Sequence, residues 1–385
     1  MLDVEQRLRD LLTDDHLTVH VSPDAVEAVH SGVRRRRRRA RVAGSAVGVA
    51  AVVAVAAIAG PVVFNRTPSP SPGRVASGTS GVWTPGPLTS LPSALTTASA
   101  MAISGGIVWI AGPAAHTVDG DVLARVDAST RRVTTMTAGL VSDLAATPRH
   151  LWAALRGGPS DPTNCALELR RTTDGGIVST YPLPCDAGGA SVPTVTADGG
   201  HAWVATDDGV HTYLRLYTAG ARTLTKQLVL AGRLAGPRVL AIGGSSVYVV
   251  TYTSDDGVVL HQLSRADLTP LRTIAAPGAR LIAYGSDRLY VADATGVASF
   301  PPDLGGRSDF ATGYVTTLTT GAGIVWCDPG GGALAGLDPR TGAVTSVAEI
   351  SADPPGIVRA DGSVLWSVRR HAGTGVGVQS AQPAP

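Results

Sequence analysis

Residues 195–204, VTADGGHAWV, show the pattern that decides the fold of this chain. A short apolar segment leads into an Asp-Gly-Gly turn, and the next segment places Trp203 between two small apolar residues. The same arrangement recurs at intervals of 36–51 residues, which is typical of repeat architectures. Five of the six tryptophans occupy its central position. The central aromatics are Trp109, Trp152, Trp203, Tyr248, Tyr290, Trp326 and Trp366.

Each repeat contains more than this pair of segments. A loop follows the aromatic, and then comes an alternating segment such as VLARVD (122–127) or YLRLY (213–217). In most copies a fourth segment follows, such as RRVTTM (131–136). Four short strands per repeat are typical of a propeller blade, whose sheet buries its faces against its neighbours. Residues 82–385 are therefore predicted to form an all-β fold, a seven-bladed β-propeller with the aromatics in its core.

Two copies depart from the pattern. The seventh supplies only about three strands before Pro385, while the segment Trp83–Leu91 (WTPGPLTSL) belongs to no blade. Because a ring must close to avoid an open edge, we predict that this segment provides the outer strand of blade 7. The fifth copy is the weakest, since residues 299–310 (SFPPDLGGRSDF) place two prolines where a fourth strand should run.

Two hairpin segments carry a resemblance to known proteins. Residues 127–133 (DASTRRV) and 338–344 (DPRTGAV) resemble the D-P-x-T-G-x-V hairpin of YVTN-type and quinoprotein-like propellers. The strands VYVVT (247–251) and LYVAD (289–293) are similar to the strand for which the YVTN family is named. The resemblance covers residues 82–385 and implies the propeller fold. It implies no single activity, because these propellers serve as binding modules, lyases and dehydrogenases alike.

A membrane anchor is predicted near the N-terminus. Residues 42–64 contain no charged side chain and would span about 35 Å as a transmembrane helix. The arginines before this segment are expected to keep the N-terminus cytoplasmic and to contact anionic lipid headgroups. The chain is thus predicted in the cell membrane with its propeller extracytoplasmic. These arginines are Arg34, Arg35, Arg36, Arg37, Arg38, Arg39 and Arg41.

Other interpretations of this region remain. A cleavable signal peptide would need an n-region of about 41 residues, which is unusually long. The moderately apolar segment also fits export by a twin-arginine route. The arginine run taken alone could be a nucleic-acid patch. Residues 42–385, however, contain 23 basic and 23 acidic residues, so the outer domain has no long-range field to attract nucleic acid.

The sequence also predicts the character of the segments on either side of the anchor. Residues 1–41 are predicted to be a cytoplasmic helical segment with amphipathic helices and the polybasic stretch, because Leu2, Val4 and Leu8 recur at helical spacing. Residues 1–33 could dock a cytoplasmic protein or lie on the bilayer, or form a poorly ordered tail. Residues 65–81 are rich in proline, serine and glycine and are predicted to be a linker.

The cysteines bear on the compartment. Cys165 and Cys185 lie symmetrically about residue 175 in a predicted hairpin, which would place them opposite each other. A disulfide there is sterically reasonable and fits an oxidising compartment. Two unconnected thiols are the alternative, because cross-strand bridges demand a particular geometry. Cys327 is predicted to be a buried thiol, and the absence of a Cys/His cluster predicts no zinc or other metal site.

Loops between the second and third strands share a surplus of aspartate. Because these loops should emerge on one face, they could form an acidic rim for a basic ligand or for a cation such as Ca²⁺, although no cofactor is predicted. The alternative is structural, since aspartate commonly caps the backbone of tight turns. The residues are Asp119, Asp161, Asp207, Asp208, Asp255, Asp256, Asp293 and Asp328.

Motifs for catalysis are missing from the sequence. The outer domain has only two glutamates, Glu168 and Glu349, and it contains no GxSxG or HExxH. We therefore favour a membrane-tethered extracytoplasmic binding or sensing module for a ligand or protein. A metal-dependent lyase or oxidoreductase of the quinoprotein-like group is the first alternative. A passive envelope scaffold is the second.

Overall fold

The computed structural model describes residues 81–384 apart from 116–119, 186–191, 222, 256, 311, 330–332, 351–356 and 372–374. The predicted cytoplasmic segment, the membrane helix, the arginine run and nearly all of the linker lie in residues 1–80, outside the described residues. Within the part of the chain that the structure describes, no helix is long and apolar enough to cross a membrane.

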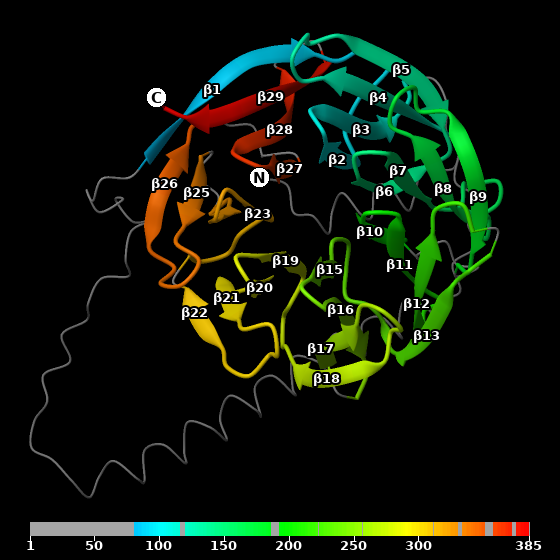
Figure 1. The fold of residues 1–385 in the computed structure, drawn as a ribbon, viewed down its shortest axis with the longest axis vertical. Coiled ribbons are helices and arrows are strands. Elements are labelled where there is room, and N and C mark those ends of the chain that lie inside the picture. The colour runs from blue at the N-terminus through cyan, green and yellow to red at the C-terminus, as the bar shows by residue number, and fades with distance from the viewer. Residues whose placement is uncertain are drawn as a thin grey trace, which may run out of the picture. The chain divides into compact units, whose positions relative to one another are not determined.

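The described residues form an all-β, propeller-like fold of small antiparallel sheets (Figure 1). The first sheet contains β2 (Ala100–Ser104), β3 (Ile107–Pro113), β4 (Asp121–Asp127) and β5 (Val133–Ala138). The second contains β6 (Val141–Ala146), β7 (His150–Leu155), β8 (Cys165–Arg171) and β9 (Ile177–Leu183). The third contains β10 (Thr194–Asp198), β11 (His201–Asp207), β12 (His211–Thr218) and β13 (Lys226–Ala231).

The remaining sheets follow in chain order. The fourth contains β14 (Arg233–Leu234), β15 (Leu240–Gly243), β16 (Ser246–Thr253), β17 (Gly257–Ser264) and β18 (Pro270–Ala275). The fifth contains β19 (Leu281–Gly285), β20 (Arg288–Ala292), β21 (Val297–Phe300) and β22 (Ser308–Phe310). The last sheet joins β23 (Leu318–Gly321), β24 (Ile324–Cys327), β25 (Leu334–Leu337) and β26 (Val344–Ala348) to β1 (Gly81–Ser90), β29 (Gly375–Pro383), β28 (Val364–His371) and β27 (Val358–Asp361).

The first strand of each sequence repeat, which in the fourth sheet is β15, lies at the centre of the ring in Figure 1. Among the described strands, these innermost ones contact one another in the order β2, β6, β10, β15, β19, β23 and β27, and β27 contacts β2 again. The later strands of each set lie progressively further out. A cavity lined by all of these strands forms a central channel, and residues at or next to the N-terminal ends of the strands line one mouth of it.

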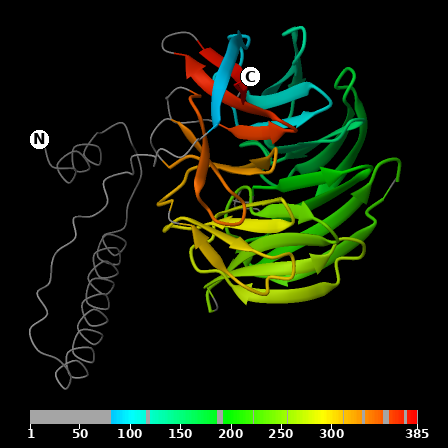
Figure 2. The same ribbon diagram turned by 60° about the vertical axis from the view of Figure 1, so that its left-hand side comes forward.

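Strand β1 joins the two ends of the propeller-like domain. It pairs antiparallel with β29, and Figure 2 shows the two strands side by side near the C-terminus. The predicted pairing of Trp83–Leu91 with the last repeat is thus present. The first three residues of β1 also pair parallel with β26, which the sequence did not predict. The ten-residue strand extends past the end of β29, so it reaches the neighbouring set and fuses two sets into one sheet.

The repeated aromatics are buried, as predicted. Each is at most 4% exposed, from Trp109 in the first repeat to Trp366 in the seventh. They fill the space between neighbouring sheets, as Tyr248 does by stacking on Tyr284 of the next sheet with ring centroids 5.8 Å apart. The Tyr284 ring lies so close to Gly243 that a side chain there would collide with it. In the fifth repeat, the proline-containing connection leaves a fourth strand of three residues, β22.

The structure contains a Cys165–Cys185 disulfide, with the two Cα atoms 6.0 Å apart. The two cysteines do not lie opposite each other in the ladder, because the β8–β9 register shifts between Leu169 and Arg170 and pairs Cys165 with Leu183. The bridge instead fastens the segment that follows β9. Cys327 is a buried free thiol, and its burial raises the pKa to about 12, so it should resist alkylation in the folded protein.

Replacing both Cys165 and Cys185 with serine should lower the free energy of unfolding by about 3 kcal/mol. The bridge spans a sequence separation of 20, and closing a loop of that size removes conformational entropy from the unfolded chain. Urea unfolding of the oxidised protein and of the double variant measures the difference. Equal midpoints would mean that the bridge contributes nothing to stability.

Candidate functional site

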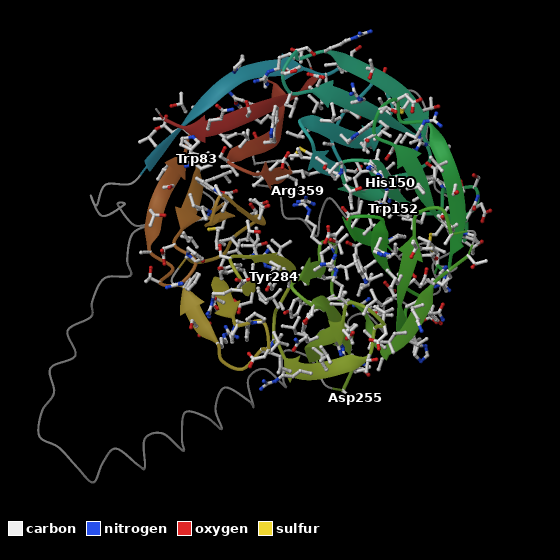
Figure 3. All side chains as sticks on the ribbon, viewed as in Figure 1. Trp83, His150, Trp152, Asp255, Tyr284 and Arg359 are labelled. Carbon is white, nitrogen blue, oxygen red and sulfur yellow. A yellow bond between two sulfur atoms is a disulfide. The ribbon has the colours of Figure 1, made fainter. Side chains whose placement is uncertain are left out.

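The described members of the predicted acidic rim do not line one common site. Asp161, Asp207, Asp208, Asp255, Asp293 and Asp328 lie at connections between second and third strands, while Asp119 and Asp256 lie outside the described residues. Asp207, Asp293 and Asp328 are buried. Asp255 lies towards the outer rim in Figure 3, far from Arg359 at the centre of the ring. The six described carboxylates therefore belong to different sheets, and none of them lines the channel cavities.

Most of these aspartates cap the turns in which they lie. Asp208 accepts hydrogen bonds from the Tyr213 hydroxyl at 2.7 Å and from the backbone N–H groups of His211 and Val210. These bonds, with that of Tyr213 foremost, hold the pKa of Asp208 well below its ordinary value. Asp161 caps its turn by accepting from Thr163. Such bonds stabilise the loops, so these aspartates have the turn-capping role that was the alternative to ligand binding.

Asp293 adds an ion pair to the same turn chemistry. Its carboxylate accepts from the backbone and hydroxyl of Thr295 and lies 3.1 Å from an Arg307 nitrogen. Burial alone would raise the pKa of Asp293, but these bonds outweigh it and the pKa is lowered. Among the described residues there is no group of three or more His, Cys, Asp or Glu side chains placed to hold a metal ion.

The channel offers a more coherent site. One cavity of about 270 Å³ is lined by residues from every innermost strand, from Met101 on β2 to Ala360 on β27. A second cavity of about 220 Å³ adjoins it at the mouth where the innermost strands begin. Small and apolar side chains dominate the walls of the channel. Hydroxyl groups from Ser99, Ser142 and Thr316 line the mouth.

Three charged side chains line both cavities: Asp143, Arg238 and Arg359. Asp143 is the third residue of β6, Arg359 is the second residue of β27, and Arg238 lies just before β15. They are the only charged residues that the described part of the chain contributes to these walls. The innermost strands of three separate repeats thus bring them together.

Asp143 is held in place by its own hydrogen bonds. One carboxylate oxygen accepts from the Leu144 N–H at 2.9 Å. The other accepts from the Thr194 hydroxyl at 2.7 Å and from the Val195 N–H at 3.0 Å. These bonds tie β6 to β10, and no arginine of the described residues comes within 4.0 Å of this carboxylate.

The backbone at Arg238 is unusual. Its φ angle of 60° lies in the left-handed region, which residues other than glycine seldom occupy. Its carbonyl accepts a hydrogen bond from the Ile282 N–H at 3.1 Å, which anchors this conformation to β19. Strained backbone of this kind often occurs at functional sites, where the surrounding structure over-determines it.

Both arginines are only partly exposed, because they face the channel and are walled in by protein on the other sides. Burial and, to a smaller extent, repulsion from Arg359 lower the pKa of Arg238 to about 10, and the attraction of Asp143 opposes this shift. Burial also lowers the pKa of Arg359, again opposed by Asp143. Two like charges are therefore held near each other in a poorly solvated place.

Sequence reasoning missed this site. The signal available was charge on strands that otherwise carry small and apolar residues, as in VSDLAA (141–146) and VRAD (358–361). That signal does not show which charged residues come together, because Asp143, Arg238 and Arg359 are far apart in sequence. Only the closed ring shows that they share one channel.

Comparisons with known proteins identify no family. No protein-family model matches the chain, and no curated protein matches it. Among solved structures, BamB from Moraxella catarrhalis is similar over 74% of this chain and 85% of its own, at 12% identity and a TM-score of 0.49. The computationally designed Ika8 protein is similar over 80% of this chain and 100% of its own, also at 12% identity and a TM-score of 0.49.

Proposed function

We propose that this chain is a membrane-tethered extracytoplasmic binding protein, a seven-bladed propeller of the YVTN-type or quinoprotein-like kind, whose ligand enters the central channel. One observation carries the proposal. Small and apolar residues make up most of the channel lining, and the only charged side chains that the described residues add to it, Asp143, Arg238 and Arg359, converge from three repeats. An apolar cavity with a few converging polar groups is the usual form of a small-molecule site.

Binding fits these groups better than catalysis does. A general base needs a free lone pair within reach of a substrate proton. The Asp143 carboxylate already accepts three hydrogen bonds at its roughly four lone-pair sites, and guanidinium groups donate only. The three side chains can therefore orient a ligand, whereas only the remaining lone pair of Asp143 could take a proton from it.

The membrane tether of the proposal rests on the sequence. Residues 42–64 lack charge and follow directly on the arginine run, which favours a cytoplasmic N-terminus. The disulfide fits an oxidising compartment for the outer domain. In intact cells, a protease added outside should remove the outer domain and leave residues 1–41 protected. Cleavage of the N-terminus instead would contradict this topology.

The cysteine pattern of the chain provides a direct test of the channel. Cys165 and Cys185 are bridged and Cys327 is buried, so a cysteine introduced at the exposed mouth residue Pro237 should be the reactive thiol of the described part of the chain. Full-length Pro237→Cys protein in detergent is labelled with a bulky maleimide and screened by thermal shift against a library of small molecules. We expect the label to abolish the stabilisation that ligands produce in the unlabelled protein.

The matched control places the label away from the channel. Leu271 lies on the outer strand β18 and is 54% exposed, so labelling Leu271→Cys should leave ligand responses unchanged. Ligands that still stabilise the protein with the blocked mouth would locate the binding surface elsewhere and overturn the proposal.

A further inference from the structure

We propose that the channel mouth binds an oxyanion, the carboxylate or phosphate group of a small ligand, between Arg238 and Arg359. This inference rests on the proposed binding function and specifies its ligand class. It goes beyond that function because the proposed function leaves the charge and chemical class of the ligand open.

Unused hydrogen-bond donors are the first reason. A guanidinium group has five N–H donors and no acceptor. Arg359 uses one of them, from Nη1 to the Val358 carbonyl at 3.2 Å. Among the described residues, the Arg238 guanidinium makes no hydrogen bond and no ion pair, although protein surrounds most of it. Buried or half-buried charges are normally paired, so these donors lack the acceptor that their surroundings call for.

Charge imbalance at the mouth is the second reason. Two positive charges face one negative charge, and the Asp143 oxygens accept hydrogen bonds from Thr194 and the backbone and not from either arginine. Asp143 therefore moderates the repulsion between the arginines at a distance but does not satisfy their donors. A ligand with one negative charge would neutralise the net charge of these three groups and accept hydrogen bonds from both guanidinium groups.

The hydroxyl groups at the mouth already donate their hydrogens within the protein, so the arginines are the side chains with donors available to a ligand. The hydroxyls of Ser99 and Ser142 each donate to backbone carbonyls, and that of Thr316 donates to Asp328 at 2.7 Å. Their hydrogens are thus engaged within the protein. The guanidinium groups of Arg238 and Arg359 would therefore bind the oxyanion, because their planar pairs of N–H donors match the oxygens of carboxylate and phosphate groups.

Cavity size limits the ligand. The mouth cavity of about 220 Å³ and the channel cavity of about 270 Å³ admit a small molecule and not a folded domain. The charged groups lie near the mouth, and the later residues Ile103 of β2, Ala146 of β6 and Ile242 of β15 line the cavity further along the channel. The ligand would place its oxyanion at the mouth and less polar parts inside.

The test uses full-length protein in detergent with inorganic phosphate and succinate as separate probes. Thermal unfolding is followed at increasing probe concentration, with sodium chloride added to keep the ionic strength constant. We expect phosphate, succinate or both to raise the midpoint saturably, since a ligand that binds only the folded state stabilises it by mass action. The probe with the larger effect assigns the oxyanion as phosphate or carboxylate. A midpoint that neither probe moves would overturn the inference.

Variants connect the response to the two arginines. Arg238→Gly removes the guanidinium and suits the left-handed backbone, so the protein should stay folded while its apparent affinity for the probe falls about tenfold or more. Arg359→Gln should lower the apparent affinity for the probe by a similar factor. Arg340→Ala, at an exposed turn outside the channel, removes the same charge and should leave the probe affinity unchanged. An unchanged affinity in both channel variants would contradict the proposed site.

The two proposals fail in different ways. If uncharged library ligands lose their effect when the mouth is blocked at position 237, but neither oxyanion moves the unfolding midpoint, the channel is the binding site and the oxyanion inference is wrong. If the oxyanions stabilise the protein equally with the mouth labelled, both the channel function and the inference are wrong.

Discussion

Trp83→Ala is expected to lower the free energy of unfolding by about 3–5 kcal/mol, the usual cost of removing a buried tryptophan side chain. Trp83 is only 3% exposed, and its ring meets that of Trp326 edge to face with centroids 4.7 Å apart. It also lies on β1 at the residue that pairs with both Ala348 of β26 and Pro383 of β29. The substitution therefore leaves a cavity where the first and last strands of the domain meet.

Chemical unfolding of the full-length protein measures this effect. Val82→Ala is the matched control, because Val82 is the preceding residue of the same strand but is 55% exposed. It should change stability by less than about 0.5 kcal/mol, as surface substitutions usually do. Trp326→Ala and the double variant complete a cycle that isolates the coupling between the rings. If Trp83→Ala cost no more than the Val82 control, the closure would depend on backbone pairing alone.

Arg170→Met should also destabilise the protein, by about 3–5 kcal/mol, because it leaves the Glu168 carboxylate buried without its partner. The two side chains are 5% and 11% exposed, and Arg170 Nη2 lies 2.6 Å from Glu168 Oε2. Arg170 Nη1 also donates to the Gly175 carbonyl at 3.0 Å, which supports the turn between β8 and β9. Replacing one partner therefore breaks the pair and part of the turn.

The neighbouring ion pair provides the control. Arg171 and Asp174 are 2.9 Å apart with side chains 55% and 56% exposed, so solvent screens their attraction. Arg171→Met should therefore cost much less stability than Arg170→Met. Replacing both buried partners, as in Glu168→Gln with Arg170→Met, should cost less than Arg170→Met alone, because no unpaired charge remains. Equal effects of the two arginine variants on urea unfolding would show that burial does not strengthen the inner pair.

The repeat pattern could be predicted from the sequence because every repeat needs the same kind of residue at the same position. A large aromatic must fill the space between neighbouring sheets, so Trp109 and its counterparts recur at one position and all are buried. The role of Trp83–Leu91 followed in the same way, from a missing strand in the last repeat. Aspartate in the loops was ambiguous, because the same residue type caps turns and binds cations, and atomic contacts were needed to find the caps of Asp161, Asp208 and Asp293.

By itself, the sequence determined the all-β repeat, its buried aromatics and the segment that closes the domain, because these depend on patterns within one repeat or on a strand that one repeat lacks. Only the tertiary structure decided the register of the disulfide hairpin, the parallel pairing of β1 with β26, and the meeting of Arg238 and Arg359 across the channel. The two arginines come from different repeats, so their proximity depends on closure of the ring and not on any local spacing.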